Sequence, residues 1–327
     1  MKKTILISVI GLVIVSAFAF YIFNEKDNVT AKVVYKEPLQ NIKIGYREHL
    51  FYLPAYVAYA KGYYKEQGLD AELVKFSSTN QLVEAIINRN IDAGIGGINA
   101  EVVLTIETKT PGMLKIFSLG IYNEQFDGLL VAKNSNIIEI KDLENKTISA
   151  IPGSSSMITM NKMIEKEGLK GKVKIVQTEP SQQLNALSSG SVDAIFVLEP
   201  LVTIAEEKGI GRVLIESPIT NYLIPDNMPY VTSVFSADFV SENPELAEKI
   251  VKAADKAIEF VNKNPEEAKL YYSDFTPISN ETEAKLPIAT YQLSGALNMA
   301  SFQEVADKLF ESGVLEKNVP AQTMFIK

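Results

Sequence analysis

The sequence contains no cysteine and a single histidine, His49. Without cysteine the chain can form no disulfide, no thiolate metal site and no thiol nucleophile. One histidine also makes a histidine-rich metal site or a Ser-His catalytic triad improbable. Because the usual residues of hydrolytic chemistry are missing, we expect no catalytic site, no metal and no cofactor. A binding function is favoured.

Positive charge is also scarce, since 32 Lys and Arg residues face 40 Asp and Glu residues, for a net charge of −8. An acidic chain is a poor match for phosphate backbones, so we expect no nucleic-acid partner. The chain has 327 residues, of which 46% are hydrophobic. This length is enough for two lobes, each with its own core.

The N-terminus carries a long apolar run, from Ile5 to Phe23, preceded by Lys2-Lys3. This pattern predicts a signal peptide or a membrane anchor over residues 1–23. Ala17-Phe18-Ala19 has the small-x-small form of a cleavage site, whereas the complete run is long enough to span a bilayer. We favour a retained anchor at residues 4–23 over cleavage near Ala19. In both cases the remaining chain lies outside the cytoplasm, because the lysines stay inside.

Residues 24–39 are polar and irregular, as expected of a tether. Strand and helix patterns then alternate, which is typical of a parallel sheet covered by helices. The expected strands are 42–46, 71–76, 91–97 and 114–121, and the expected helices are 54–67, 79–90 and one starting at Asn99. Further along, Asn243-Pro244 starts a long helix that runs to about Asn262.

The second half of the chain repeats the first at an offset of about 100 residues. Glu66-Gln67-Gly68-Leu69 recurs as Lys166-Glu167-Gly168-Leu169, and Ile91-Asp92-Ala93 recurs as Val192-Asp193-Ala194. Two matches in one register predict two copies of one α/β unit. Two similar lobes that face each other create a cleft between them.

Two short β-rich segments, 128–132 and 230–235, are interpreted as the strands that connect the lobes. The predicted lobe boundaries follow from them. Residues 40–127 and 231–327 form one lobe, and residues 128–230 form the other.

The segment from Thr147 to Met160 is the most informative local pattern. A short strand, 148–151, is broken by Pro152-Gly153, and Ser154, Ser155 and Ser156 stand before an expected helix from Met157 to Glu167. The start of a helix offers unpaired N–H groups and a partial positive charge, which suit an anionic or acceptor-rich ligand. N-capping alone is the other interpretation, although one serine would suffice for a cap.

Two other motifs have simple explanations. The segment from Gly94 to Gly97 is too short for a dinucleotide fingerprint, and the serine loop lacks the lysine of a phosphate-binding P-loop. Glu199 is interpreted either as a ligand contact or as a carboxylate favoured by a helix N-terminus.

The stretch from Tyr52 to Val74 resembles the opening signature of ABC-transporter solute-binding proteins, in the branch for sulfonates, nitrate, taurine and thiamine-precursor pyrimidines. Later landmarks also match, at Asp92-Ala93-Gly94, Leu143 to Thr147, Pro152-Gly153-Ser154, and Val192-Asp193-Ala194 through Glu199-Pro200. The resemblance implies a type II periplasmic-binding-protein fold, α/β with two lobes and two hinge strands, each lobe being a mostly parallel sheet flanked by helices. It also implies a monomer that closes on a small organic solute and delivers it to an ABC permease and its ATPase.

Carried over residue by residue, the ligand loops of that family fall on Leu50, Phe51, Tyr52, Gly97, Ile98, Asn99, Ser154, Ser155, Ser156 and Glu199. Two departures stand out. Tyr52 and Leu53 occupy the place where some pyrimidine-precursor members carry a histidine before the proline. The related pyrimidine-synthesising enzymes have a cysteine-rich motif, which this chain lacks.

The side chains give mixed indications about the ligand. Helix starts near Pro54, Asn99 and Ser155 favour an anion or an acceptor-rich ring. Flat walls that suit an organic body are expected from Phe51, Tyr52, Tyr222 and Tyr230. Asp127 and Glu199, if they reach the cleft, instead demand a donor such as an amine.

We therefore expect an organosulfonate-like solute, with a thiamine-precursor pyrimidine or another heterocycle as the alternative. A simple inorganic anion ranks lower. A pyrimidine-synthesis enzyme on the same fold is the rival from another class.

Overall fold

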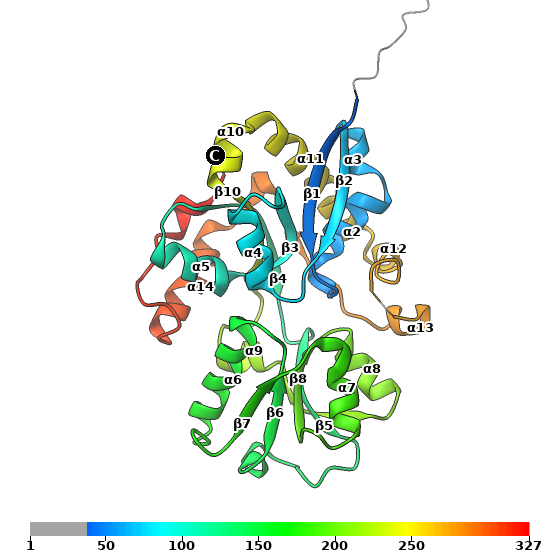
Figure 1. Ribbon diagram of the computed structural model, residues 1–327, viewed down its shortest axis with the longest axis vertical. Coiled ribbons are helices and arrows are strands. Elements are labelled where there is room, and N and C mark those ends of the chain that lie inside the picture. The colour runs from blue at the N-terminus through cyan, green and yellow to red at the C-terminus, as the bar shows by residue number, and fades with distance from the viewer. Residues whose placement is uncertain (1–37, 277, 327) are drawn as a thin grey trace, which may run out of the picture. The chain divides into compact units, whose positions relative to one another are not determined.

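The computed structural model describes residues 38–276 and 278–326 (Figure 1). The predicted signal or anchor at residues 1–23, and the tether up to residue 37, lie outside these residues. Among the described helices, none is both long enough and apolar enough to cross a bilayer. The segment Leu39–Lys327 forms one compact unit that contains two separate sheets.

The first sheet takes its strands from both ends of this unit. They are β1 (Gln40–Tyr46), β2 (Leu69–Lys75), β3 (Ala93–Asn99), β4 (Leu114–Tyr122), β10 (Met228–Ser236) and β11 (Tyr291–Gln292). Their order across the sheet is β11-β4-β10-β3-β1-β2. β1 pairs in parallel with β2 and β3, whereas β10 pairs antiparallel with β3 and β4.

Helices flank this first sheet, and the sheet and its helices together are called lobe 1. The α-helices are α2 (Leu53–Ala60), α3 (Tyr63–Glu66), α4 (Thr79–Ile87), α5 (Ala100–Lys109), α10 (Ala237–Glu242), α11 (Pro244–Lys263), α12 (Pro265–Lys269), α13 (Asn280–Glu283) and α14 (Met299–Glu311). Short 3-10 helices are η1 (Leu50–Tyr52), η3 (Ser294–Ala296) and η4 (Ala321–Met324).

The second sheet and its helices form lobe 2, drawn in green in Figure 1. Its strands are β5 (Asp127–Ala132), β6 (Thr147–Ala150), β7 (Lys174–Gln177), β8 (Ala194–Leu198) and β9 (Gly211–Glu216), in the order β7-β6-β8-β5-β9. Its helices are η2 (Ile140–Leu143), α6 (Ser154–Lys166), α7 (Pro180–Ser188), α8 (Leu201–Glu207) and α9 (Pro218–Tyr222).

The internal repeat predicted from the sequence is visible in the strand pairing. In each lobe one strand has two parallel neighbours, β1 with β2 and β3, and β6 with β7 and β8. The two aspartates of the repeat also make equivalent hydrogen bonds, each with a backbone N–H of a neighbouring strand. Asp92 accepts the N–H of Lys43 at 2.7 Å, and Asp193 accepts the N–H of Thr147 at 2.8 Å. The two-lobed α/β fold is thereby confirmed.

Three details differ from the expectations. The sheets are mixed rather than mostly parallel, because β5 and β10, the first strands after the two crossings between the lobes, pair antiparallel with their neighbours. The two segments interpreted as connecting strands, 128–132 and 230–235, lie within β5 and β10, and the crossings between the lobes come just before these strands. The expected helix 54–67 is interrupted at Gly62, where a φ of 72° ends α2 before α3 begins.

The long helix expected after Asn243-Pro244 is α11, and its apolar face closes the core of lobe 1. Ile250, Ala254, Ile258 and Val261 are buried on that face, at helical spacing. Burial of each large aliphatic side chain contributes about 1.5–3 kcal/mol of stability. This helix packs against α2, a helix that comes after the carboxyl end of β1 in the chain.

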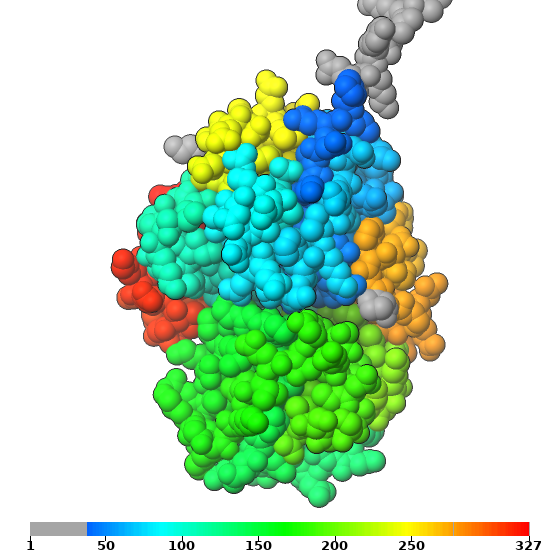
Figure 2. Space-filling view, in the orientation of Figure 1, coloured from blue at the N-terminus to red at the C-terminus, as the bar shows by residue number. Residues whose placement is uncertain are grey.

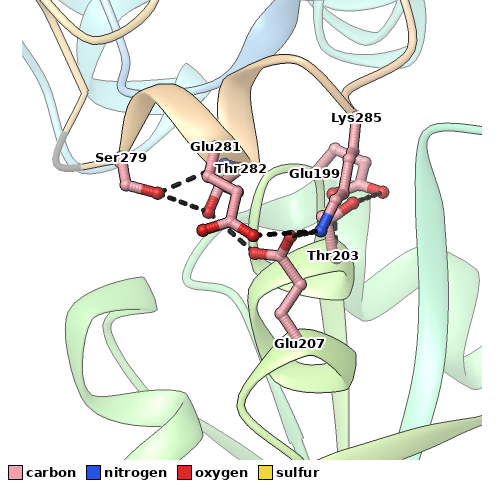
Figure 3. A network of polar contacts seen from close by, with 7 residues as sticks. All are labelled: Glu199, Thr203, Glu207, Ser279, Glu281, Thr282 and Lys285. Carbon is pink, nitrogen blue, oxygen red and sulfur yellow. Dashed lines mark hydrogen bonds and ion pairs between the residues drawn. The ribbon is translucent and has the colours of Figure 1, made fainter.

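The two lobes touch each other through side chains, and Figure 2 shows the green surface of lobe 2 against the cyan surface of lobe 1. Asn80 of α4 accepts hydrogen bonds from the Ser154 N–H at 3.1 Å and the Ser154 hydroxyl at 3.2 Å. On another side, Glu207 of α8 accepts the Thr282 hydroxyl at 2.8 Å and pairs with Lys285 (Figure 3). The structure therefore has its lobes in contact.

Candidate functional site

A pocket lies at the contact between the two lobes, where the carboxyl ends of β1, β3 and β6 meet helix starts. Its volume, which includes space open to solvent, is about 370 Å³. The lining residues are Arg47, Thr79, Asn80, Asn99, Ile151, Pro152, Gly153, Ser155, Ser156, Phe196, Leu198 and Ile219.

Arg47 is the one lining residue that carries a full charge. It follows β1 directly, is 7% exposed, and donates from Nη1 to the Thr79 hydroxyl at 3.1 Å. Its Nε has no hydrogen-bond partner among the described residues. Burial lowers the pKa of Arg47, but a guanidinium remains protonated at neutral pH. The pocket thus offers a fixed positive charge with an unused donor.

Two helix starts in lobe 1 add polarity beside Arg47. Ser78 caps α4 by accepting the Gln81 N–H at 3.3 Å, and this places Thr79 and Asn80 in the first turn. The Thr79 hydroxyl donates to the side-chain oxygen of Asn99 at 3.2 Å. Asn99 is the N-cap residue of α5, so the partial positive ends of α4 and α5 lie at the same pocket.

Lobe 2 contributes the serine segment, and its local structure differs from the expectation. The helix starts at Ser154, three residues earlier than expected, and Gly153 is the N-cap with a φ of 129°. No serine side chain caps the helix, so the capping interpretation is wrong. Ser154 bonds to Asn80, and the Ser156 hydroxyl donates to the Ile151 carbonyl. Ser155 and Ser156 line the pocket.

A carboxylate that sequence reasoning missed lies behind Ser155. Glu101, in the first turn of α5, is 0% exposed, and neither of its oxygens has a partner in hydrogen-bonding geometry among the described residues. Burial raises the pKa of Glu101, and the nearby hydroxyls of Ser155 and Tyr230 oppose the rise. The Tyr230 ring is also buried, with its hydroxyl beside Asn99. Tyr230 thus lies behind the lining rather than in it.

His49 and Tyr52 form a second buried polar group in lobe 1. Their rings meet edge to face with centroids 4.8 Å apart. Burial and the Arg47 charge lower the pKa of His49 well below 6.5, so its ring is neutral. A Cβ atom on Gly97 would lie 2.4 Å from the Tyr52 ring. Gly97 therefore makes room for these rings and is not a lining residue.

Two carboxylates predicted as ligand contacts, Asp127 and Glu199, instead accept hydrogen bonds from other residues of the protein. Asp127 accepts hydrogen bonds from the Tyr122 hydroxyl at 2.9 Å, the Ser217 hydroxyl at 2.8 Å and the Ile219 N–H at 3.1 Å. Glu199 accepts both the N–H and the hydroxyl of Thr203, at 3.1 and 2.9 Å. Burial raises the pKa of Asp127 to about 6 and that of Glu199 to about 7. Neither lines the pocket.

Of the predicted site residues, the structure brings Asn99, Ser155 and Ser156 together at the pocket, with Ser154 at its edge. Leu50 and Phe51 are buried in lobe 1, where Phe51 stacks on Tyr122 with centroids 5.0 Å apart. Whether any of these residues contacts a solute stays a prediction.

Sequence reasoning missed Arg47, the start of α4 and Glu101. One available signal was the position of Arg47 directly after the first strand. The helix start expected near Pro54 is replaced by α4, because η1 and α2 are packed into the core.

Among the described residues, no group of three or more His, Cys, Asp and Glu side chains is arranged to hold a metal ion. The residues that line the pocket provide one cation, helix N-termini, hydroxyls, the two side-chain amides of Asn80 and Asn99, and apolar side chains, namely Ile151, Phe196, Leu198 and Ile219. Such a set can orient an organic anion or an acceptor-rich ring.

Known proteins are similar to this chain in sequence and in fold. A putative aliphatic sulfonates-binding protein of Bacillus subtilis is 25% identical over 290 residues, covering 86% of this chain and 84% of that protein. A 4-amino-5-hydroxymethyl-2-methylpyrimidine phosphate synthase of Saccharomyces cerevisiae is 24% identical over 239 residues, 70% of this chain and 69% of the yeast protein.

Among solved structures, the alkanesulfonate-binding protein SsuA from Xanthomonas axonopodis pv. citri, bound to MOPS, superposes with a TM-score of 0.69. It is 18% identical and covers 89% of this chain and 99% of its own, and this likeness shows the fold. The family model described as NMT1/THI5 like matches residues 51–268, which is more than half of the chain. With two lobes, a polar pocket between them and this match, the chain belongs to the NMT1/THI5-like family.

Proposed function

We propose that the chain is the solute-binding receptor of an ABC importer and acts outside the cytoplasmic membrane. It closes its two lobes on a small organic solute, with an organosulfonate-like compound favoured, and delivers it to the permease and its ATPase. The observation that carries this proposal is the pocket between the lobes, where Arg47 faces the first turn of α6.

The polarity of this pocket suits an oxyanion better than a cation. Arg47 and the N-termini of α4, α5 and α6 all present positive charge or N–H donors to it. Phe196, Leu198 and Ile219 line it as well and suit an alkyl or aryl body. The similarity to sulfonate-binding proteins supports the same class of solute.

A thiamine-precursor pyrimidine is the second candidate. The similarity to the yeast pyrimidine phosphate synthase favours it. The ring of Phe196, which lines the pocket, also suits contact with a flat heterocycle.

A pyrimidine-synthesis enzyme is a weaker third reading. The chain has no cysteine, and its one histidine is buried behind the pocket.

A thermal-shift screen of the purified full chain against sulfonates, nitrate, pyrimidines and flavins tests the proposal. A solute at one hundred times its dissociation constant stabilises the fold by roughly 2.7 kcal/mol, which gives a clear rise in melting temperature. Arg47→Met is expected to abolish the shift caused by the best anion. Arg89→Gln is the matched control, because Arg89 pairs with Glu242 away from the pocket. A shift of equal size in both variants, or turnover of the solute, contradicts the proposal.

A further inference from the structure

We propose that Thr79 is a positioning residue of the pocket. Its hydroxyl holds the Arg47 guanidinium and the Asn99 amide in fixed orientations, so that both keep donors for a bound solute. This inference rests on the proposed function, because it concerns the pocket where the solute is proposed to bind. It deepens that function by naming the residue that orients the charged group of the pocket lining.

The first observation is that the Thr79 hydroxyl has a partner on each side. Arg47 Nη1 donates to it at 3.1 Å, and it donates to Asn99 Oδ1 at 3.2 Å. A guanidinium only donates, and a contact between a hydroxyl and an amide oxygen takes its hydrogen from the hydroxyl. All three residues are buried, with at most 7% of their surface exposed. Thr79 has therefore committed its one hydrogen, and it acts through Arg47 and Asn99.

The second observation is that a neutral group holds Arg47. Among the described residues, the Thr79 hydroxyl is the one hydrogen-bond partner of this guanidinium, and the arginine that forms an ion pair is Arg89, with Glu242. A buried arginine is usually paired with a carboxylate, which takes up its charge. A hydroxyl orients the guanidinium without neutralising it, so the charge of Arg47 remains for the solute.

The third observation is the orientation of the Asn99 amide. Its oxygen is turned toward Thr79, so its two N–H donors are left for other partners. Asn99 lines the pocket and is the N-cap residue of α5. One hydroxyl thus orders two donors on the lobe 1 wall of the pocket, the charged one of Arg47 and the neutral one of Asn99.

The fourth observation is that Thr79 is itself held in place. It is the first residue of α4, and the Ser78 side chain caps that helix. A β-branched side chain has few χ1 rotamers in a helix. The next residue, Asn80, accepts two hydrogen bonds from Ser154 of lobe 2. The orientation of Arg47 and the contact between the lobes therefore depend on the same helical turn.

The test begins with nuclear magnetic resonance of the full chain. The chain contains three arginines, Arg47, Arg89 and Arg212, so labelling them with nitrogen-15 gives few signals, and Arg47→Met identifies those of Arg47. We expect separate Nη signals for Arg47, because the hydrogen bond to Thr79 slows rotation about the Nε–Cζ bond. Thr79→Val removes the hydroxyl and should speed this rotation about 10-fold or more, whereas Thr79→Ser should keep it slow.

Calorimetric titration with ethanesulfonate measures the consequence for binding. We expect Thr79→Val to bind this probe about 10-fold more weakly, and Thr79→Ser to stay within about threefold of the parent. Valine keeps the methyl group and loses the hydroxyl, whereas serine does the opposite, so a residue that only packed would give the reverse order. If Thr79→Val does not fold, Thr79→Ala supplies the variant without a hydroxyl.

Thr108→Val is the matched control. Thr108 is also buried, and its hydroxyl donates to the Thr105 carbonyl at 2.7 Å, at the other end of α5 from the pocket. This variant should keep both the slow rotation of Arg47 and the affinity for ethanesulfonate.

Averaged Nη signals of Arg47 in the parent, or an equal rotation rate in Thr79→Val, overturn the inference and leave the receptor function standing. Equal affinity of the parent and Thr79→Val for ethanesulfonate also overturns it. Failure of the parent to bind ethanesulfonate counts against the proposed organosulfonate-like solute, and the rotation rates in the parent, Thr79→Val and Thr79→Ser then decide the inference.

Discussion

At the scale of single residues, the pocket region concentrates buried polar atoms that no described residue satisfies. They include Arg47 Nε, both ring nitrogens of His49, both Glu101 oxygens and the hydroxyls of Tyr52 and Tyr230. Each such group costs about 1–3 kcal/mol when it is buried without a partner. Buried polar groups without partners lower stability, so we expect them mainly where a residue serves ligand binding. Their clustering beside one pocket fits that expectation.

Glu199 gives a pH dependence whose sign follows from its pKa. Burial raises its folded-state pKa to about 7 from the ordinary 4.5. Its stabilising contribution is therefore complete below about pH 4.5 and is lost as the pH rises through 7. Glu199→Gln mimics the neutral form, so the variant should gain roughly 3 kcal/mol relative to the parent between pH 4.5 and 8. Urea unfolding of both proteins across this range measures the difference. If the free energy of unfolding depends on pH in the same way for the parent and for Glu199→Gln, the Glu199 carboxylate is not desolvated in the folded protein.

Gly97 leaves room for two buried rings beside the pocket, those of Tyr52 and His49. A Cβ atom there would lie 2.4 Å from the Tyr52 ring and 2.8 Å from His49. Gly97→Ala should lower the free energy of unfolding by about 1–3 kcal/mol through overpacking. Gly295→Ala is the control, because its added Cβ meets nothing within 4 Å. Urea denaturation measures both, and similar small effects would contradict the packing shown here.

At the scale of elements, the starts of α4 and α6 connect the two lobes beside the pocket. Asn80 lies in the first turn of α4, and its side-chain oxygen accepts two hydrogen bonds from Ser154, the first residue of α6. The contact brings a lobe 1 helix start and a lobe 2 helix start to the same pocket. The lobes are therefore held together next to the atoms expected to hold the solute.

Asn80→Ala should weaken solute binding about 5- to 10-fold, since it removes an acceptor that two donors share when the lobes meet. The melting temperature without solute should change little, because each lobe keeps its own core. Calorimetric titration and a melting curve measure the two effects. Asn88→Ala, at the other end of α4, serves as the control. An unchanged affinity in Asn80→Ala would show that this contact does not assist closure.

Many of the helices and strands could be predicted from the sequence, because hydrophobic periodicity and internal repeats reflect local structure. The register of Asp92 and Asp193 correctly indicated two copies of one unit, and Asn243-Pro244 marked the start of α11. The mixed sheets could not be read from the sequence, since β5 and β10 pair with strands far away in the chain.

The candidate site was only partly predictable. Helix starts are local signals, which is why Asn99 and Ser155 were found. Arg47 and Glu101 become special only through tertiary burial, which no local pattern reports. Asp127 and Glu199 looked like ligand contacts, but donors from Tyr122 and Thr203 meet them in the folded protein.

At the scale of the whole compact unit, two lobes are linked by two short crossings, at residues 123–126 and 223–227. Across from the pocket contacts, Glu207 of lobe 2 meets Thr282 and Lys285 of lobe 1 (Figure 3). The Lys285 side chain is 53% exposed and the Glu207 side chain 23%, so salt weakens the attraction within this ion pair. The arrangement is suited to a hinge motion in which contacts between lobes form and break.

Glu207→Gln should shift the solute-free protein toward separated lobes, because it removes the charge that pairs with Lys285. Raising the ionic strength should have the same effect on the parent and little effect on the variant. Small-angle scattering measures the radius of gyration in each condition. The same radius for both proteins at low and high salt would contradict a role for this pair.

The central claim is that a solute held by Arg47 closes the two lobes, and an interlobe distance tests it most directly. The chain contains no cysteine, so Ile138→Cys in lobe 2 and Leu270→Cys in lobe 1, both at exposed positions, provide two unique labelling sites. Single-molecule energy transfer between the labels is recorded with and without the best solute from the thermal-shift screen. The account predicts that the solute converts a broad distance distribution into one narrow, shorter-distance population, and that Arg47→Met abolishes this change. A distribution that stays the same while calorimetry shows the solute bound, or an equal change in Arg47→Met, would contradict it.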